Sequence, residues 1–236
     1  MKKLFVTLVI ACTLFSCHDF ENQERGNGNV TTRTREVTGN FTKIVVGQGI
    51  DVEIEQAESY GIEVEADSNL LEHIKTTIDD GVLKISSDVN IQNAEKLLVK
   101  VKIKQLNEIE TTSTSSVESV NIFKGKTLRI ASSSASSVDI EAEYESMHLE
   151  STSTGEITIK GKTLKLETSA SSASEIDASD LLANDVFAQA TSASQTSVHA
   201  LVKLDAKASS AGSITSVNKP KEIRKEETSG GEVSIE

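Results

Sequence analysis

The sequence contains few of the residues that build a bulky or cross-linked core. Among its 236 residues there are one proline, two cysteines and no tryptophan, and aromatic residues make up only 3%. A single proline and 13 glycines exclude collagen-like and proline-rich chains. A hydrophobic share of 37% excludes a polytopic membrane protein. Because serine, threonine and alanine are abundant instead, we expect a thin core packed from small residues.

Positive charge is also scarce. The formal net charge is -12, from 24 basic and 36 acidic residues. Such a chain repels phosphate backbones, and charge alone does not attract it to an anionic membrane surface. We therefore expect no nucleic acid among its partners.

Both cysteines lie within the first 17 residues, so no later part of the chain can form a disulfide or a cysteine metal site. Two lysines precede a short apolar run there, and the segment Leu14-Phe15-Ser16-Cys17 is similar to a lipobox. We expect residues 1–16 to be a lipoprotein signal peptide and Cys17 to carry acyl chains that bind the mature chain to a membrane. The alternative is an ordinary signal peptide with a chance cysteine.

Residues 17–38 are polar and lack a sustained apolar period, which predicts a lipid-anchored flexible tether. Asp19, Glu21 and Glu24 follow the cysteine closely. They resemble the acidic export signals of Bacteroidetes-type lipoproteins, although a solvated linker explains them equally well. The expected location is the cell envelope, as an outer-membrane lipoprotein on the periplasmic or surface-exposed face.

Short strands with period-two alternation are predicted between residues 41 and 103. Their apolar members are Ile44/Val46, Ile50/Val52/Ile54, Ile62/Val64, Leu83/Ile85 and Val99/Val101/Ile103. Glycines in the segments 47–49 and 79–81 supply turns between them. We expect residues 39–105 to form N-terminal strands that cap one end of the domain.

From residue 106 to residue 236 the sequence repeats with a period of about 19 residues. The first apolar anchors of the units are Ile109, Ile130, Leu149, Leu166, Ala188, Ala206 and Lys225. The second anchors, at offsets of 8 or 10, are Val117, Val138, Ile157, Ile176, Val198, Ile214 and Val233. Even offsets keep the apolar side chains on one face of a strand. The pattern predicts an all-β fold, a parallel β-helix over residues 39–236, for which right-handed crossovers are the default.

Each repeat also carries a hydroxyl three residues after its first anchor. The members of this column are Thr112, Ser133, Thr152, Ser169, Thr191, Ser209 and Thr228. In stacked parallel strands such side chains lie about 4.8 Å apart and can hydrogen-bond to one another. We expect a structural hydroxyl ladder, with an exposed binding strip as the less favoured alternative.

Several segments together carry a family resemblance. FTKIVVGQGIDVEIEQ, LRIASSSASSVDI and EETSGGEVSIE resemble the putative auto-transporter adhesin, head GIN domain family of Bacteroidetes lipoproteins, a domain of unknown function. The resemblance covers nearly the whole mature chain and implies a β-helical fold and an adhesin role. The family's turns are often Ser-Gly-Ser-Gly, whereas serine and alanine replace most of those glycines here.

The sequence contains no recognisable catalytic, metal or cofactor motif. Its four histidines lack metal-ligand spacing, and the two GKT segments, at residues 125–127 and 161–163, lack the preceding glycine of a phosphate-binding loop. We expect a non-catalytic adhesin or display module whose ligand is a glycan, a matrix protein or an envelope protein. The alternative is a polysaccharide-active lyase or hydrolase, because β-helices host such enzymes.

Overall fold

The computed structural model describes residues 23–236, which contain strands, turns and loops but no helix. The predicted signal peptide, the predicted lipidation site Cys17 and the start of the predicted tether lie outside the described residues. No helix in residues 23–236 is long and apolar enough to cross a bilayer.

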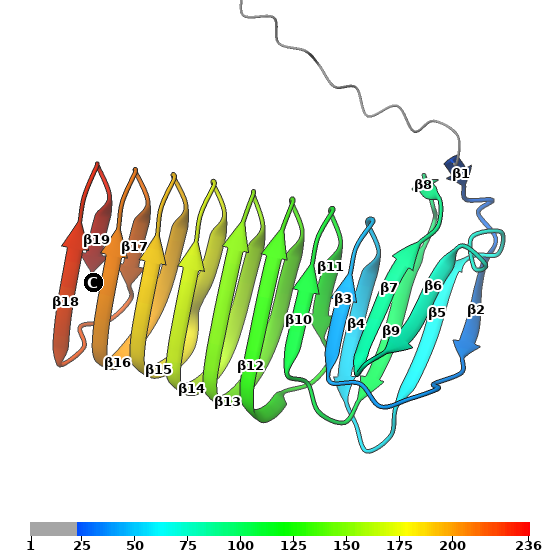
Figure 1. Ribbon diagram of the computed structural model, residues 1–236, viewed down its shortest axis with the longest axis horizontal. Helices are drawn as coiled ribbons and strands as arrows, with labels where there is room; N and C mark the ends of the chain where they lie inside the picture. The colour runs from blue at the N-terminus through cyan, green and yellow to red at the C-terminus, as the bar shows by residue number, and fades with distance from the viewer. Residues whose placement is uncertain (1–22) are drawn as a thin grey trace, which may run out of the picture.

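The described chain is a parallel β-solenoid made of two layers of strands packed face to face (Figure 1). We call these layers the first sheet, which holds the first strand of each coil, and the second sheet. They are continuous at the corners, so 17 strands form one hydrogen-bonded sheet, and two N-terminal strands pair separately. Each coil has one strand in each sheet, joined by a tight turn at one edge and by a corner at the other. The strands of the repeats are β10 (Glu108–Thr111), β11 (Ser116–Ser119), β12 (Phe123–Ser133), β13 (Ser137–Thr152), β14 (Glu156–Ala170), β15 (Glu175–Ala190), β16 (Gln195–Ala208), β17 (Ser213–Ser216), β18 (Glu222–Glu227) and β19 (Glu232–Ile235). Strands β13 to β16 bend at the corner and belong to both sheets.

The repeats confirm the predicted period and parallel pairing. Ile109 pairs with Ile130, and Ile130 with Leu149, so each coil stacks in register on the one before it. In Figure 1 the first strand of each coil rises on the near side, the second descends on the far side, and the coils advance leftward toward β18. This is the right-handed sense expected for parallel crossovers.

Antiparallel strands close one end of the stack and confirm the predicted N-terminal cap. The strands of this region are β1 (Gln23–Arg25), β2 (Val30–Arg35), β3 (Lys43–Val46), β4 (Asp51–Gln56), β5 (Gly61–Asp67), β6 (Ile74–Asp79), β7 (Val82–Ser87), β8 (Asn90–Gln92) and β9 (Leu97–Ile103). The first coil, β3 and β4, stacks on β10 and β11. Beyond it, β7 pairs antiparallel with β6, and β9 with β5. We call residues 23–105 the cap and residues 106–236 the repeats.

Two parts of the predicted tether are strands, so that prediction is wrong for residues 23–25, which pair with β8, and for residues 30–35. Strand β2 pairs antiparallel with β5 along its whole length. Its side chains are polar because it is an edge strand whose residues are mostly exposed, and such a strand needs no apolar period. The segment before it is held as well, because the carboxylate of the buried Asp67 accepts hydrogen bonds from the backbone N–H groups of Gly28 (3.0 Å) and Glu95 (3.2 Å).

Two of the predicted core anchors are displaced by two residues. Thr168, not Leu166, continues the column of Leu149, and Thr196, not Val198, continues the column of Ile176. Both threonines are buried, and their hydroxyls have no hydrogen-bond partner. Threonine has nearly the shape of valine, so the column accepts it, whereas a search for apolar residues passes over it. With this correction every offset between the two anchors is 8 residues.

The tight turns at one edge of the solenoid adopt an unusual backbone conformation. Each has two consecutive residues in the left-handed region, as in Ser134 (φ 55°) and Ala135 (φ 59°). Such type I′ turns favour glycine and asparagine, because a Cβ is strained there. Hydrogen bonds between neighbouring turns offset part of this strain, such as Ala135 N–H to Ser153 O at 3.2 Å. Serine and alanine therefore occupy these turns without disrupting them.

Candidate functional site

The structure brings the predicted hydroxyl ladder together only in part. Hydrogen bonds join Thr152 to Ser171 (3.1 Å) and Ser209 to Thr191 (3.0 Å) on neighbouring coils. Ser171 occupies the position predicted for Ser169, because the anchor of that coil is Thr168. Ser169 itself lies two residues earlier, beside Glu150 and Gln189 on the outer face of β14. Its assignment to the ladder was wrong.

The remaining predicted members do not bond to one another. Thr112 contacts the hydroxyl of the adjacent Ser113 at 3.4 Å, and Ser133 lies 3.5 Å from the carbonyl oxygen of Thr111. Thr228 is exposed on the last coil. The column is therefore a partly formed ladder at the start of the turns.

A second column of serines is buried and was missed by the sequence reasoning. Ser174 donates to the carbonyl oxygen of Ser151 (2.7 Å), and Ser194 to that of Ala170 (2.9 Å), so each turn is tied to the coil before it. Glycine replaces serine at this position where the coils approach more closely. A Cβ on Gly212 would lie 2.4 Å from the carbonyl oxygen of Ala190. The signal in the sequence is the constant spacing of six residues after the corrected first anchor.

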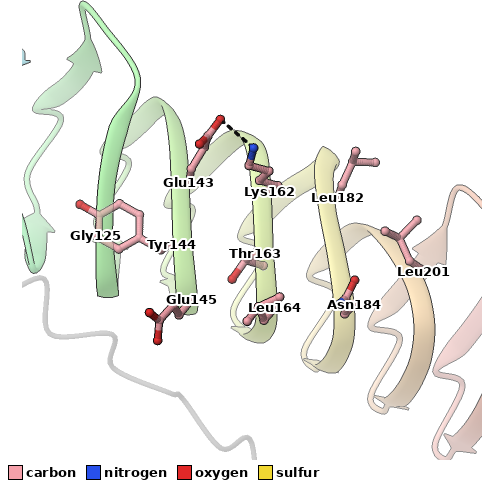
Figure 2. A pocket seen from close by; sticks show the side chains of 10 residues that line it. All are labelled: Gly125, Glu143, Tyr144, Glu145, Lys162, Thr163, Leu164, Leu182, Asn184 and Leu201. Atoms are coloured by element: carbon pink, nitrogen blue, oxygen red, sulfur yellow. Dashed lines mark ion pairs between the residues drawn. The ribbon is translucent and has the colours of Figure 1, made fainter.

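The opposite edge of the solenoid carries a groove of about 450 Å³, which we call the corner groove (Figure 2). Its lining residues are Gly125, Glu143, Tyr144, Glu145, Lys162, Thr163, Leu164, Leu182, Asn184 and Leu201. Leu164, Leu182 and Leu201 come from three successive strands and are 55%, 44% and 38% exposed. They do not share one register, since Leu182 lies between Lys162 and His199, but as exposed leucines on neighbouring coils they form an apolar contact surface.

Local backbone features turn these leucines outward. Register shifts interrupt the pairing of β14 with β15 after Thr158, and of β15 with β16 after Ala178. A bulge changes which side chains face the core, so Leu181 is buried while the adjacent Leu182 faces solvent. Gly161 has a φ of +120°, and a Cβ there would lie 2.1 Å from the carbonyl oxygen of Ala142.

A buried tyrosine fixes the end of the corner groove nearest the cap. The Tyr144 ring packs on Gly125, where a Cβ would lie 2.4 Å from the ring. The Tyr144 hydroxyl donates to the carbonyl oxygen of Leu106 at 2.7 Å. Burial raises the pKa of Tyr144, so the phenol stays neutral and serves to position the wall.

Two carboxylates, Glu143 and Glu145, border the corner groove, and Glu143 is held in place by lysines. Glu143 forms ion pairs with Lys124 (3.1 Å) and Lys162 (3.3 Å). Hydrogen bonds from these two ammonium groups hold the pKa of Glu143 below its ordinary value. The carboxylate is therefore charged at neutral pH, which suits ligand contact better than proton donation.

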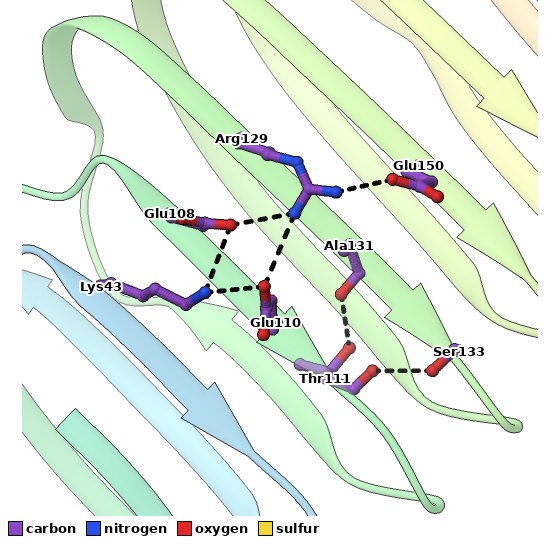
Figure 3. A network of polar contacts seen from close by, with 8 residues as sticks. All are labelled: Lys43, Glu108, Glu110, Thr111, Arg129, Ala131, Ser133 and Glu150. Atoms are coloured by element: carbon purple, nitrogen blue, oxygen red, sulfur yellow. Dashed lines mark hydrogen bonds and ion pairs between the residues drawn. The ribbon is translucent and has the colours of Figure 1, made fainter. Parts of the chain in front are cut away.

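A network of charged side chains joins the cap to the repeats across the outer face of the first sheet (Figure 3). Lys43 lies between Glu110 (2.7 Å) and Glu108 (3.4 Å), and Arg129 contacts Glu108 (2.9 Å) and Glu150 (2.6 Å). The hydrogen bond with Lys43 lowers the pKa of Glu110 and raises the pKa of Lys43. These groups are only partly exposed and already paired, so they stabilise the stack and leave little charge for a ligand.

The histidines within residues 23–236 stand apart from one another. His73 contacts Asp88 at 2.8 Å, His148 contacts Glu167 at 3.4 Å, and His199 lies 3.2 Å from the carbonyl oxygen of Ser179. Over the same residues, no three His, Cys, Asp or Glu side chains gather closely enough to hold a metal ion.

Comparisons with known proteins place the chain in context. The family model of the putative auto-transporter adhesin, head GIN domain matches residues 40–220. No curated protein sequence matches the chain.

Crystal structures of similar proteins share the fold. A putative adhesin from Bacteroides fragilis NCTC 9343 aligns with a TM-score of 0.83 and 20% identity, over 90% of this chain and 100% of that one. A putative adhesin from Parabacteroides merdae ATCC 43184 aligns with a TM-score of 0.74 and 20% identity, over 91% and 99% of the two chains. A putative lipid binding protein from Parabacteroides distasonis ATCC 8503 aligns with a TM-score of 0.72 and 22% identity, over 91% and 100%.

Proposed function

Since the chain belongs to the putative auto-transporter adhesin, head GIN domain family, we propose that it is a non-catalytic binding module displayed on the cell envelope. The corner groove is its ligand-binding surface. Leu164, Leu182 and Leu201 make the apolar contact, and Glu143 and Lys162 border it with charge. The observation that carries this proposal is the presence of three exposed leucines from successive strands in one groove.

The chemistry of the corner groove favours a ligand with an apolar surface. Full burial of an exposed leucine gains about 1.5–3 kcal/mol, and since these three are already about half covered, each adds about 1 kcal/mol to association. The Parabacteroides distasonis relative carries the name putative lipid binding protein, and the two adhesin relatives carry a name that implies a surface ligand. A lipid, or an apolar patch on a matrix or envelope protein, fits this surface.

The proposed cellular location is the outer membrane. Residues 1–16 act as the lipoprotein signal peptide, Cys17 carries the acyl chains, and the residues before β1 form a short tether. A Cys17→Ala variant expressed in the native cell should lose acyl labelling and leave the membrane fraction. Retained labelling would contradict the anchor.

Binding is tested with the chain from residue 18 onward, which keeps every described strand. It is incubated with immobilised polysaccharides, matrix proteins and phospholipid vesicles, and each sample is read for retained protein and for new reducing ends or unsaturated uronate. A variant with Leu164→Ser, Leu182→Ser and Leu201→Ser should lose at least tenfold of the retention. The matched control is Val120→Ser with Ile223→Ser, which changes two exposed apolar residues outside the corner groove.

The outcomes separate binding from catalysis. Retention without product, lost in the leucine variant alone, supports the proposed module. Product formation overturns it in favour of a polysaccharide lyase or hydrolase. Equal retention by the leucine variant and the wild type rules out the corner groove as the binding surface.

A further inference from the structure

One aromatic side chain of the described region stands apart from the others. Phe41, Phe123 and Tyr144 are buried, and Tyr60 packs against Phe41 with ring centroids 4.9 Å apart. Phe187 lies on the outer face of β15 and is only partly covered. Because it directly precedes the anchor Ala188, the alternation of the strand turns its ring away from the core. An aromatic ring placed on an outer sheet face is available to a ligand.

Phe187 borders a shallow hollow of about 310 Å³ on the first sheet, which we call the aromatic hollow. Its lining residues are Ser146, Met147, Lys165, Leu166, Glu167, Asp185, Val186, Phe187, Lys203 and Asp205. Strand register arranges the outward side chains in two rows. One row is Glu167, Phe187 and Asp205, and the other is Lys165, Asp185 and Lys203. The ring is therefore surrounded by polar groups of both charges.

Several of these polar groups are free to meet a ligand. Within residues 23–236, no ion pair involves Lys165, Asp185 or Lys203, although they are neighbours across the sheet and all exposed. Asp205 is not among them, because its carboxylate is mostly covered, with Oδ2 at 3.7 Å from Arg224 and Oδ1 buried without a hydrogen-bond partner. The Lys207 Nζ atom lies over one face of the Phe187 ring, 5.6 Å from its centre, and 3.8 Å from Glu226, which leaves the other face of the ring for a ligand.

We propose that the aromatic hollow is a subsite for one pyranose unit of a glycan. The apolar C–H face of a sugar ring stacks on an aromatic ring, while its hydroxyls need donors and acceptors around the edge. Phe187 supplies the platform, Asp185 accepts, and Lys165 and Lys203 donate. In their row, Lys165 and Lys203 flank Asp185, so two ammonium groups face one carboxylate there and favour a sugar that carries a carboxylate.

This subsite rests on the proposed function only in that both are binding and not catalysis, since it lies on a sheet face and not in the corner groove. The hollow has the volume of a small ligand site, which suits one or two sugar units. A ligand with an apolar part and a sugar part could occupy each surface separately. The two sites are therefore tested with separate variants.

Calorimetric titration of the chain from residue 18 tests the subsite with two matched probes, trigalacturonic acid and β-1,4-galactotriose. We expect the wild type to bind the acidic probe at least threefold more tightly than the neutral one. Phe187→Ala should weaken binding of both at least tenfold, whereas Phe187→Tyr keeps the ring and should stay within threefold. Lys165→Gln with Lys203→Gln should remove the preference for the acidic probe. All variants are surface changes, and their melting temperatures verify folding.

The failures of the two proposals are distinguishable. If neither trisaccharide binds the wild type at 10 mM, or if Phe187→Ala binds as well as the wild type, the sugar subsite is wrong. The leucine variant of the corner groove should bind both trisaccharides normally. If it loses them while Phe187→Ala does not, sugars bind in the corner groove and the aromatic hollow is not their site.

Discussion

The cap and the repeats fill their cores differently. Within the described chain, the cap buries a single alanine, Ala66, among isoleucines, leucines, valines and Phe41. The buried alanines of the repeats are Ala142, Ala170, Ala178, Ala183, Ala188, Ala190, Ala200, Ala206 and Ala208. Because the hydrophobic free energy of folding scales with buried apolar area, a coil of the repeats gains less from its own side chains than the cap does. The repeats depend on being stacked.

Strand pairing also differs between the cap and the repeats, and it too makes the repeats depend on stacking. The cap contains antiparallel hairpins such as β6–β7, whose partners are close in sequence. Every strand pair formed within the repeats is parallel and joins neighbouring coils. Coils of this kind are stable only through their neighbours, so the cap provides the template on which the repeats stack. The two regions therefore have different roles. The cap contributes most of the stability, and the repeats provide long, regular surfaces.

The largest expected effect comes from removing the same side chain in each region. Leu83 in the cap and Leu204 in β16 are both fully buried. Leu83→Ala should lower the free energy of global unfolding by about 2–5 kcal/mol, because the cap supports every coil. Leu204→Ala should mainly loosen β16 to β19, with a smaller change in the global transition. Urea unfolding followed by circular dichroism measures both, and equal losses would remove the distinction between the regions.

A smaller loss is expected from filling the closest approach between coils. A side chain on Gly212 meets the backbone of Ala190, so Gly212→Val should destabilise the last coils by about 1–3 kcal/mol. Ser194→Gly is the matched control, since it changes the same position of the preceding coil without a clash. It should cost about 1 kcal/mol, for the hydrogen bond to Ala170. If the two variants have the same melting temperature, Gly212 does not lie as close to the backbone of Ala190 as described.

Two substitutions should strengthen the thin core of the repeats. Thr168 and Thr196 bury hydroxyls that have no partner. Thr168→Val and Thr196→Val keep the shape and remove the unsatisfied group, so each should stabilise by about 1 kcal/mol. The control is Thr152→Val, which breaks the hydrogen bond to Ser171 and should be neutral or destabilising. A loss of stability in both core variants would contradict the assigned register.

The smallest effect concerns the charged network between cap and repeats. The pKa of Glu110 is lowered in the folded chain, so its contribution is present above the unfolded pKa of about 4.3 and disappears as the pH falls through the lower folded value. The raised pKa of Lys43 makes its contribution full below about pH 10 and lost as the pH rises through the folded value. Solvent screens these partly exposed groups, so we expect less than about 1 kcal/mol.

Thermal melts between pH 3 and pH 7 measure this contribution. Glu110→Gln should be slightly less stable than the wild type at pH 7 and equal to it at pH 3. Glu58→Gln, at an exposed acid on a turn, is the control and should follow the wild type throughout. A difference between Glu110→Gln and the wild type that is the same at every pH would show that charge is not its cause.

Much of the fold could be predicted because side chains along a strand alternate strictly between its two faces. Even offsets between anchors are a property of the residues alone, and they led to the parallel coil and its period. The strand register was wrong at Thr168 because threonine has the shape to fill an apolar position. A search for apolar residues does not find it. The polar edge strand β2 was missed for a related reason, since its stability comes from pairing with β5 and not from its own side chains.

The candidate sites were less predictable than the fold. The corner groove depends on bulges after Thr158 and Ala178, and a bulge is set by how neighbouring coils meet, not by the local sequence. One part of the aromatic hollow could be predicted from the sequence. Phe187 directly precedes the anchor Ala188, so the alternation of the strand turns it outward. The two rows of outward side chains around Phe187 could not be predicted, because they depend on the strand register of three coils.

Hydrogen exchange of the chain from residue 18, followed by mass spectrometry, tests the division between cap and repeats most directly. Protection should be highest from β3 to β13 and decline coil by coil through β15 and β16 to β18 and β19. This gradient follows from a bulky cap at one end and small, stacked residues at the other. Uniform protection along the solenoid, or a maximum in the last coils, would contradict the account.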